Sequence, residues 1–261
     1  MRKFITLAAV TAVTLLTGIA ASHAETLSVE DVVRRNLATT KGFVDSREQM
    51  TMTITRANGQ QVTRRMISRA LEVADDGNKT LIIFQDPADV KGAGVLTHSH
   101  ITGNDDQWIY LPAVRRVKRI SSANKSGPFM GSEFAYEDLS SNEFGKYTYA
   151  DAGQKQADGR NHYLVERRPT YDRSGYLRQI VWIDDQDFLI RRIDMYDRSD
   201  RLYKTQTLGS YKQFLPGFWR ALKIDVKNHK TGKGTTLEWN GDIRFKNGFR
   251  DRDFNKNALK R

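Results

Sequence analysis

The chain has 261 residues, a formal net charge of +11 and no cysteine. The absence of cysteine excludes disulfides, thiol catalysis and a lipid anchor on a processed cysteine. A chain of this length can bury a core of its own within one domain.

The first 24 residues have the pattern of an export signal. Arg2 and Lys3 precede an apolar run at 4–20, and Ser22-His23-Ala24 forms a small-x-small cleavage site. The run does not exceed the roughly 20 apolar residues that a membrane span needs, so we predict cleavage. The signal holds two basic residues and no acidic one, which leaves +9 on residues 25–261. We predict that these residues form a single exported domain. Export disfavours nucleic acid as a partner and leaves anionic lipid, an acidic partner or simple solubility as reasons for the charge.

One long helix is predicted, and it comes first. Ser28 is placed as its N-cap, with Asp31 three residues later as in a capping box. Gly42 is placed to end it. The apolar residues that share one face are Val29, Val32, Val33 and Leu37.

The rest of the chain is predicted to be β-structure. Met50, Met52 and Ile54 alternate with threonines, which places them on one face of a strand. Asn58-Gly59 predicts a tight hairpin that returns into 62–71. Further strand-like runs occur at 80–84, 107–111, 147–149, 162–165, 179–183, 188–195, 202–214, 222–226 and 237–245.

Many strands joined by short turns favour a mainly β (α+β) fold, built as a curved antiparallel sheet or a partly closed β-barrel. The N-terminal helix and the irregular segment 121–144, with its short helical pieces, are expected to cover the concave apolar face.

The residue pattern predicts no enzyme, no metal site and no cofactor. His98 and His100 can share a strand face, but a closed metal site needs two more ligands. We therefore interpret them as polar residues near a strand end. Glu133, Glu137 and Asp138 could form an acid–base pair, although surface or capping roles are favoured.

The large apolar side chains of the sequence indicate a cavity that could hold acyl chains. Flexible and aromatic side chains suit such a cavity, with an ordinary filled core as the alternative. The predicted wall consists of Met50, Met52, Ile54, Met66, Trp108 and Tyr110. The predicted lid or gate consists of Phe129, Met130, Phe134 and Tyr136, on or next to a loop that follows Gly127-Pro128. A basic string, Arg115, Arg116, Lys118 and Arg119, is either a solvated face or a rim that docks an anionic head group or membrane surface.

The sequence resembles the LolA-like family of outer-membrane lipoprotein-sorting proteins. The resemblance covers about 32–259 and is carried by FQDPADVKG at 84–92, DDQWIYLP at 105–112, Arg119-Ile120 and FMGSEFAYEDL at 129–139. It implies a partly closed barrel of about 11 strands plugged by helices. It also implies transport of acyl chains without covalent chemistry, an inner-membrane transporter of the resistance-nodulation-division (RND) type, and an outer-membrane acceptor. The chain is longer than the dedicated lipoprotein carrier, and no arginine here is matched to the arginine that locks that carrier's lid.

These observations predict a periplasmic carrier that binds lipid or lipoprotein acyl chains in a hydrophobic cavity and passes them toward the outer membrane. Burial of each CH₂ contributes about 0.8 kcal/mol to such binding. The alternatives are a regulatory sensor of envelope components on the same fold and an envelope hydrolase that uses Glu133 or Glu137.

Overall fold

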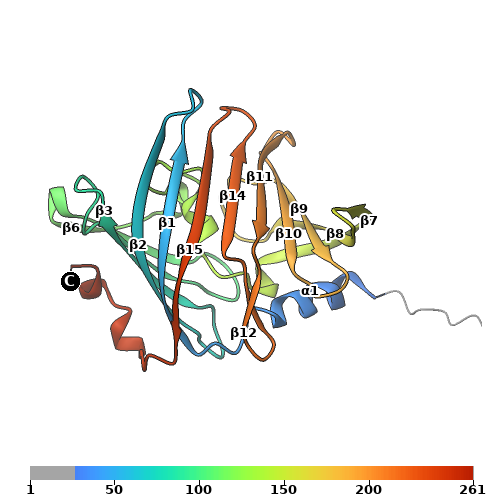
Figure 1. The fold of residues 1–261 in the computed structure, drawn as a ribbon, viewed down its shortest axis with the longest axis horizontal. Coiled ribbons are helices and arrows are strands. Elements are labelled where there is room, and N and C mark those ends of the chain that lie inside the picture. The colour runs from blue at the N-terminus through green and yellow to red at the C-terminus, as the bar shows by residue number, and fades with distance from the viewer. Residues whose placement is uncertain (1–26, 261) are drawn as a thin grey trace, which may run out of the picture.

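The computed structural model describes residues 27–260, so the predicted signal peptide lies outside the described residues. The body is one antiparallel sheet of 13 strands in the order β6-β5-β4-β3-β2-β1-β15-β14-β11-β10-β9-β8-β7 (Figure 1). Its strands are β1 (Asp45–Thr55), β2 (Gln61–Leu71), β3 (Lys79–Asp86), β4 (Gly94–His98), β5 (Asp106–Leu111), β6 (Arg116–Arg119), β7 (Tyr147–Ala157), β8 (Arg160–Pro169), β9 (Arg178–Asp184), β10 (Ile190–Tyr196), β11 (Leu202–Gly209), β14 (Lys223–Asn228) and β15 (Gly234–Phe245).

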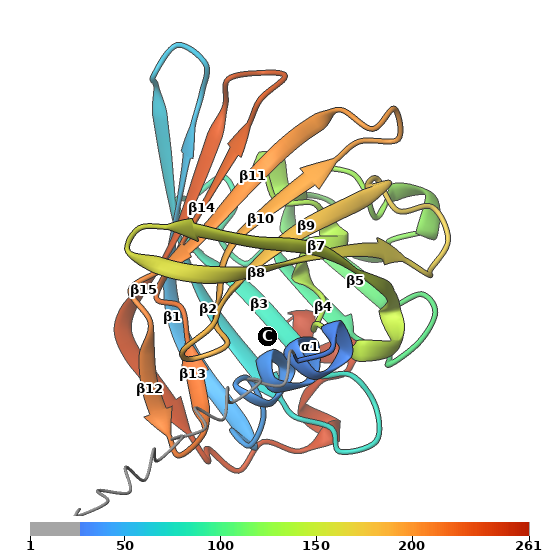
Figure 2. The same cartoon turned by 90° about the vertical axis from the view of Figure 1, so that its right-hand side faces the viewer.

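The sheet is curved and open. Its two end strands, β6 and β7, are not paired with each other in the described part of the chain. Figure 2 shows the β7–β8 end curling round and crossing in front of the β1–β5 half. This confirms the curved antiparallel sheet predicted from the strand pattern, with more strands than the number implied by the resemblance.

Local sequence explains most strand boundaries. The hairpin between β1 and β2 turns at Asn58-Gly59, where Gly59 has φ +84°, a value that glycine adopts without steric cost. The run predicted as one strand at 202–214 is two strands, because Ser210 takes φ +52° and the chain turns there. Its second part, β12 (Lys212–Leu215), pairs with β13 (Phe218–Arg220) in a separate two-stranded sheet.

The predicted helix is α1 (Val29–Ala38), and Ser28 caps it by accepting a hydrogen bond from the Asp31 backbone N–H at 3.1 Å. It ends at Thr39, three residues before the Gly42 expected to end it. Val32 and Val33 are buried on its inner face. They form one cluster with apolar side chains of β8, β9 and β10. The helix therefore covers one end of the concave face (Figure 2).

The C-terminal segment after β15, which the sequence analysis did not single out, covers the opposite, convex face near β3–β6. It contains two short 3-10 helices, η6 (Asp251–Asp253) and η7 (Lys256–Lys260). Phe254 and Leu259 are buried there against Leu81 and Leu96. The segment is a strap that closes a second, convex apolar cluster.

Asp45 anchors this strap. Its carboxylate accepts hydrogen bonds from the backbone N–H groups of Asn247, Gly248 and Phe249 at 2.7–3.1 Å and from the Asn247 side chain. Burial raises the pKa of Asp45, but these hydrogen bonds outweigh it and lower the pKa overall. The stability that ionised Asp45 adds to the fold is therefore fully present above pH about 4, the ordinary pKa of an aspartate. It is lost as the pH falls through the lowered pKa of Asp45.

We expect Asp45→Asn to loosen the strap by about 1–3 kcal/mol, because an amide nitrogen would face two N–H donors that need an acceptor. Limited proteolysis should show faster cleavage within 246–260. Asp75→Asn, on an exposed loop, should leave cleavage unchanged. Equal cleavage of the two variants would show that the carboxylate does not hold the strap.

Candidate ligand-binding site

A lid, defined here as residues 121–146, lies over the concave face. It is built from short 3-10 helices at Ser122–Asn124, Phe129–Gly131, Tyr136–Leu139 and Phe144–Lys146. Phe129 and Phe134 are buried among concave-face side chains of β1–β4. The Phe129 ring centroid lies 5.7 Å from that of Phe84 and 5.8 Å from that of Tyr136. The side chains of Phe129 and Phe134 thus point into the concave face, and the role of the segment as a lid or gate stays a prediction.

Four residues of the predicted wall lie together beneath this lid. Met50, Met52, Ile54 and Met66 are buried in the same cluster as Phe129. Met130 and Tyr136 pack against that cluster and are half-buried. The space between sheet and lid is filled by these side chains, so an acyl chain can occupy it only if lid side chains move out.

Trp108 and Tyr110, also predicted as wall, lie on the other face of the sheet. On β5, Ile109 packs against the concave cluster. Trp108 and Tyr110 pack against the convex one. Successive side chains of a strand point to opposite faces, so one strand could not place all three in one cavity. The predicted wall is corrected to the β1–β2 residues, and Trp108 lies under the strap instead.

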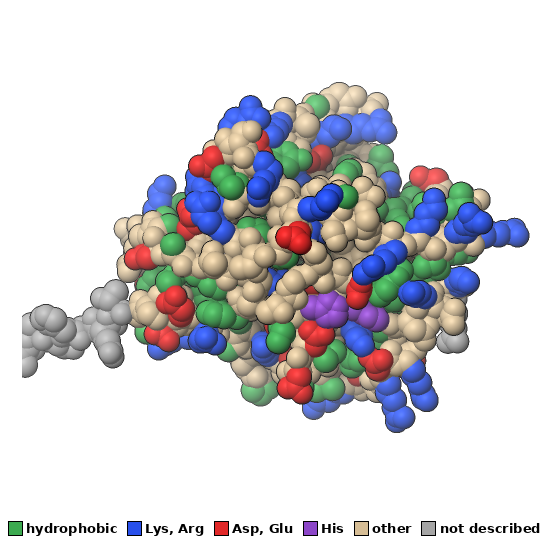
Figure 3. All heavy atoms as spheres, turned by 180° about the vertical axis from the view of Figure 1, so that it is seen from behind, with side chains coloured by type: hydrophobic (Ala, Val, Ile, Leu, Met, Phe, Trp, Pro, Cys, Tyr) green, Lys and Arg blue, Asp and Glu red, His purple; other side chains and the backbone are tan. Residues whose placement is uncertain are grey.

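The basic string lies at the open edge of the sheet. Arg116 and Lys118 lie on the edge strand β6 and are exposed, as are Arg115 and Arg119. Arg119 forms an ion pair with Asp106. Figure 3 shows that basic side chains are spread over the face opposite to that of Figure 1, interspersed with acidic ones. The docking role of the string stays a prediction.

The two histidines have structural partners. His98 Nε2 lies 2.7 Å from the Phe254 carbonyl oxygen of the strap. His100 Nδ1 lies 2.8 Å from an oxygen of Asp76. No group of three or more histidine and carboxylate side chains within 27–260 could hold a metal ion. These contacts agree with the interpretation of His98 and His100 as polar residues near a strand end.

Glu133 ties the lid to the centre of the sheet. Its backbone N–H donates to Thr235 Oγ1 at 2.9 Å, and its carbonyl oxygen accepts from Lys204 Nζ at 2.7 Å. Its carboxylate accepts from Asn228 Nδ2 at 2.6 Å. The surface role favoured for Glu133 is therefore wrong, since the residue is buried. A further anchor is the Arg64 guanidinium, which donates to the Met130 carbonyl oxygen.

Glu137 and Asp138 join the lid to the β8–β9 connection and are half-buried, not surface groups. Glu137 accepts hydrogen bonds from Ser174 Oγ at 2.7 Å, the Gly175 N–H at 2.9 Å and the Tyr171 hydroxyl at 3.1 Å. The capping role expected for Asp138 is confirmed, because it accepts from the Ala135 N–H at 2.7 Å. It also accepts from the Tyr176 hydroxyl at 3.0 Å.

Removal from water raises the pKa of both carboxyl groups. For Glu137 the neighbouring charge of Asp138 raises the pKa further. For Asp138 burial is the largest effect, and Lys204 opposes it. Because the pKa of both groups is raised when the lid is closed, protonation of these groups stabilises the closed lid. This stabilisation is fully present below pH about 4, the ordinary pKa of a carboxyl group, and is lost as the pH rises through the raised pKa.

We therefore expect Asp138→Asn to remove the free-energy cost of burying a charged carboxylate, a cost that grows as the pH rises. One amide oxygen can accept both hydrogen bonds that one carboxylate oxygen of Asp138 accepts now. The stability of wild type relative to the variant should fall as the pH rises from about 4 to about 8, as measured by urea unfolding at each pH. Asp158→Asn, on an exposed turn, should show no such trend. A wild-type advantage that grows with pH would contradict the raised pKa.

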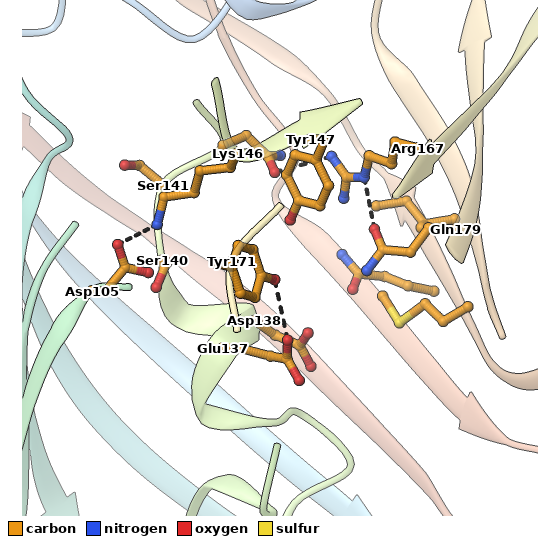
Figure 4. A pocket seen from close by; sticks show the side chains of 14 residues that line it. Asp105, Glu137, Asp138, Ser140, Ser141, Lys146, Tyr147, Arg167, Tyr171 and Gln179 are labelled. Carbon is orange, nitrogen blue, oxygen red and sulfur yellow. Dashed lines mark hydrogen bonds and ion pairs between the residues drawn. The ribbon is translucent and has the colours of Figure 1, made fainter. Parts of the chain in front are cut away.

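A polar cavity of about 70 Å³ lies between these carboxylates and the strands β7–β11 (Figure 4). Buried Lys146 pairs with Asp105 at one side. Buried Arg167 donates to Gln179 Oε1 at 2.6 Å and to Asn142 Oδ1 at 3.1 Å. The cavity has room for several water molecules, but not for an acyl chain.

A second, smaller cavity of about 20 Å³ lies beneath α1. Its lining is mostly apolar and includes Val33, Leu37, Val165, Val181 and Ile183. Asn142, Tyr147 and Arg167 line both cavities. The interior thus has a polar compartment that borders an apolar one under the helix.

Neither Lys146 nor Arg167 was predicted from the sequence as a site residue. One feature of the sequence could have identified Arg167. It shares a strand face with Val165, which is buried in the apolar cluster between α1 and the strands β8–β10. A charged residue at an inward position of an alternating strand marks a polar site inside a fold. Lys146 had no such feature, since it lies at the end of an irregular segment.

Comparisons with known proteins agree on this architecture. A family model described as an uncharacterized protein matches residues 76–261. A candidate outer membrane lipoprotein-sorting protein domain from Vibrio parahaemolyticus is 47% identical with a TM-score of 0.85, over 88% of this chain and 97% of that one. A DUF1329 family protein from Desulfovibrio piger is 31% identical with a TM-score of 0.80, over 87% of this chain and 95% of that one.

A LolA superfamily protein from Nitrosomonas europaea shares the fold at 17% identity, with a TM-score of 0.72, over 89% of this chain and 100% of that one. No curated protein matches the sequence. Within the described residues, no helix is both long and apolar enough to cross a membrane.

Proposed function

Because the chain belongs to the LolA-like family of outer-membrane lipoprotein-sorting proteins, we propose that it is a periplasmic carrier of lipid or lipoprotein acyl chains. Its role is to shield an acyl chain from water between the curved sheet and the lid, without covalent chemistry. The observation that carries this proposal is the insertion of Phe129 and Phe134 from an irregular segment into the concave apolar face.

The free energies of burial favour replacement of the lid side chains by the acyl chain of a ligand. Burial of one phenylalanine side chain contributes about 1.5–3 kcal/mol, whereas each CH₂ of a chain contributes about 0.8 kcal/mol. A chain of about fourteen CH₂ groups therefore gains roughly 11 kcal/mol, more than the two displaced rings lose. The lid is thus a displaceable substitute for the cargo.

Transfer requires the lid to open at a partner with higher affinity for the chain. In this proposal an inner-membrane RND-type transporter delivers the acyl chain to the protein, and an outer-membrane acceptor receives it. The exposed basic string, Arg115, Arg116, Lys118 and Arg119, is proposed as the docking rim for such a partner or for the anionic membrane surface.

Native mass spectrometry of the mature protein, purified from periplasm without detergent, tests the proposal. We expect a mass excess that fragments to a lipid or an acylated peptide. Protein at its bare mass that also takes up no fluorescent fatty acid would overturn the carrier function.

A disulfide can test whether the lid must open. Glu133 and Thr235 are hydrogen-bonded neighbours across lid and sheet, and the chain has no other cysteine. We expect oxidised Glu133→Cys/Thr235→Cys protein to lose uptake of a fluorescent fatty acid, and reductant to restore it. Each single variant should take up the probe with or without reductant. Unchanged uptake by protein shown to be cross-linked would separate binding from lid opening.

A further inference from the structure

The polar cavity holds charged groups whose hydrogen-bond partners are neutral. Glu137 is bonded to two hydroxyls and a peptide N–H. Asp138 is bonded to a peptide N–H and a hydroxyl. Arg167 is bonded to two amide oxygens. Lys204 and Arg167 lower the pKa of Asp138, but the structure shows no ion pair of Glu137, Asp138 or Arg167 within residues 27–260. A buried charge without a paired opposite charge is costly, so the cavity can accept ligand groups of both signs.

Not every charge in the cavity contributes to this complementarity. Lys146 and Asp105 already form an ion pair with each other and therefore cancel. The remaining carboxylates belong to the lid and the remaining guanidinium belongs to β8. Cationic and anionic groups of one ligand would thus contact lid and sheet at the same time. Burial raises the pKa of both Glu137 and Asp138, and for Asp138 it outweighs the opposing charges of Lys204 and Arg167.

From this arrangement we propose that the polar cavity binds the zwitterionic head group of an amphiphile, of the phosphoethanolamine type. The ammonium lies at Glu137 and Asp138, the phosphate lies at Arg167, and the acyl chain lies between the sheet and the lid, as in the proposed function. Charge-assisted hydrogen bonds of this kind are stronger than neutral ones. The inference rests on the proposed carrier function and adds a head-group specificity to it.

The test is a competition between two lipids with identical acyl chains. Mature protein is incubated with vesicles of equimolar phosphatidylethanolamine and phosphatidylglycerol, and the captured lipid is identified by mass spectrometry. We expect about a tenfold excess of phosphatidylethanolamine, the ratio that corresponds to one charge-assisted contact. This preference would oppose the formal charge of +9 on the mature chain, which by itself attracts the anionic lipid.

Equal capture, or an excess of phosphatidylglycerol, would overturn the head-group site and leave the carrier function intact. Capture of neither lipid would overturn both. Calorimetric binding of soluble glycerophosphoethanolamine against glycerophosphoglycerol tests the site without the chain. The same excess is expected, and no discrimination would count against the proposal.

Variants locate the specificity. Asp138→Asn and Arg167→Gln should each reduce the phosphatidylethanolamine excess to about twofold or less. Asp158→Asn and Arg56→Gln, both exposed on turns, should retain it. Thermal unfolding confirms that each variant is folded. If Arg167→Gln does not fold, the isosteric Asp138→Asn still decides, and an unchanged lipid ratio in that variant would overturn the assignment.

Discussion

Phe129→Ala is expected to weaken closure of the lid by about 3–5 kcal/mol, the usual cost of truncating a buried phenylalanine. The ring is 2% exposed and lies between Phe84 and Tyr136. Its loss leaves a cavity at the point where the lid enters the sheet. The lid is otherwise held by Phe134 and by the polar contacts of Glu133, Glu137 and Asp138. Opening should therefore become more frequent, and a bound chain should leave faster.

Hydrogen exchange of residues 121–146 and release of a fluorescent fatty acid measure this effect. Phe254→Ala is a matched control, because Phe254 is 1% exposed but lies on the convex face under the strap. We expect it to lower global stability to a similar extent without speeding exchange in the lid or release of the probe. Equal effects of both variants on the lid would show that Phe129 stabilises only the core.

Glu48→Ala is expected to destabilise the whole domain by about 3–5 kcal/mol, because it breaks a buried ion pair and leaves a cation uncompensated. Glu48 is completely buried and accepts from Arg220 Nη2 at 2.8 Å and from Trp239 Nε1 at 2.6 Å. Ser46 Oγ donates to it at 2.7 Å. The carboxylate thus joins β1 to β13 and β15 on the face that also carries Met50.

Urea unfolding measures the loss. Glu238→Ala removes a carboxylate from the same sheet, but Glu238 is about half exposed and lies 3.9 Å from Lys223. An exposed pair of this kind contributes about 0–1 kcal/mol. A small effect of Glu48→Ala, similar to that of the control, would show that Arg220 and Trp239 find water or other partners.

Local sequence pattern was sufficient to predict most of the secondary-structure elements. The Met-Thr alternation predicted β1, Asn58-Gly59 predicted its hairpin, and Ser28 predicted the start of α1. Phe129, Met130, Phe134 and Tyr136 were predicted as a lid or gate, because large apolar side chains on or next to a glycine-flanked loop gain free energy by leaving water. Each of these properties depends on neighbours within a few residues in the chain.

The sequence by itself therefore determined α1 and most of the strands, since period-two alternation, turns and caps are local effects. It did not predict β4 or β13 as strands, and the role of the lid stays a prediction. Only the tertiary structure decided which face of β5 is concave, because that depends on how the whole sheet curls. It also decided that Glu48 meets Trp239, 191 positions away in the chain. The polar cavity also depends on the tertiary structure, because Glu137 and Arg167 come together only when the lid lies on the sheet.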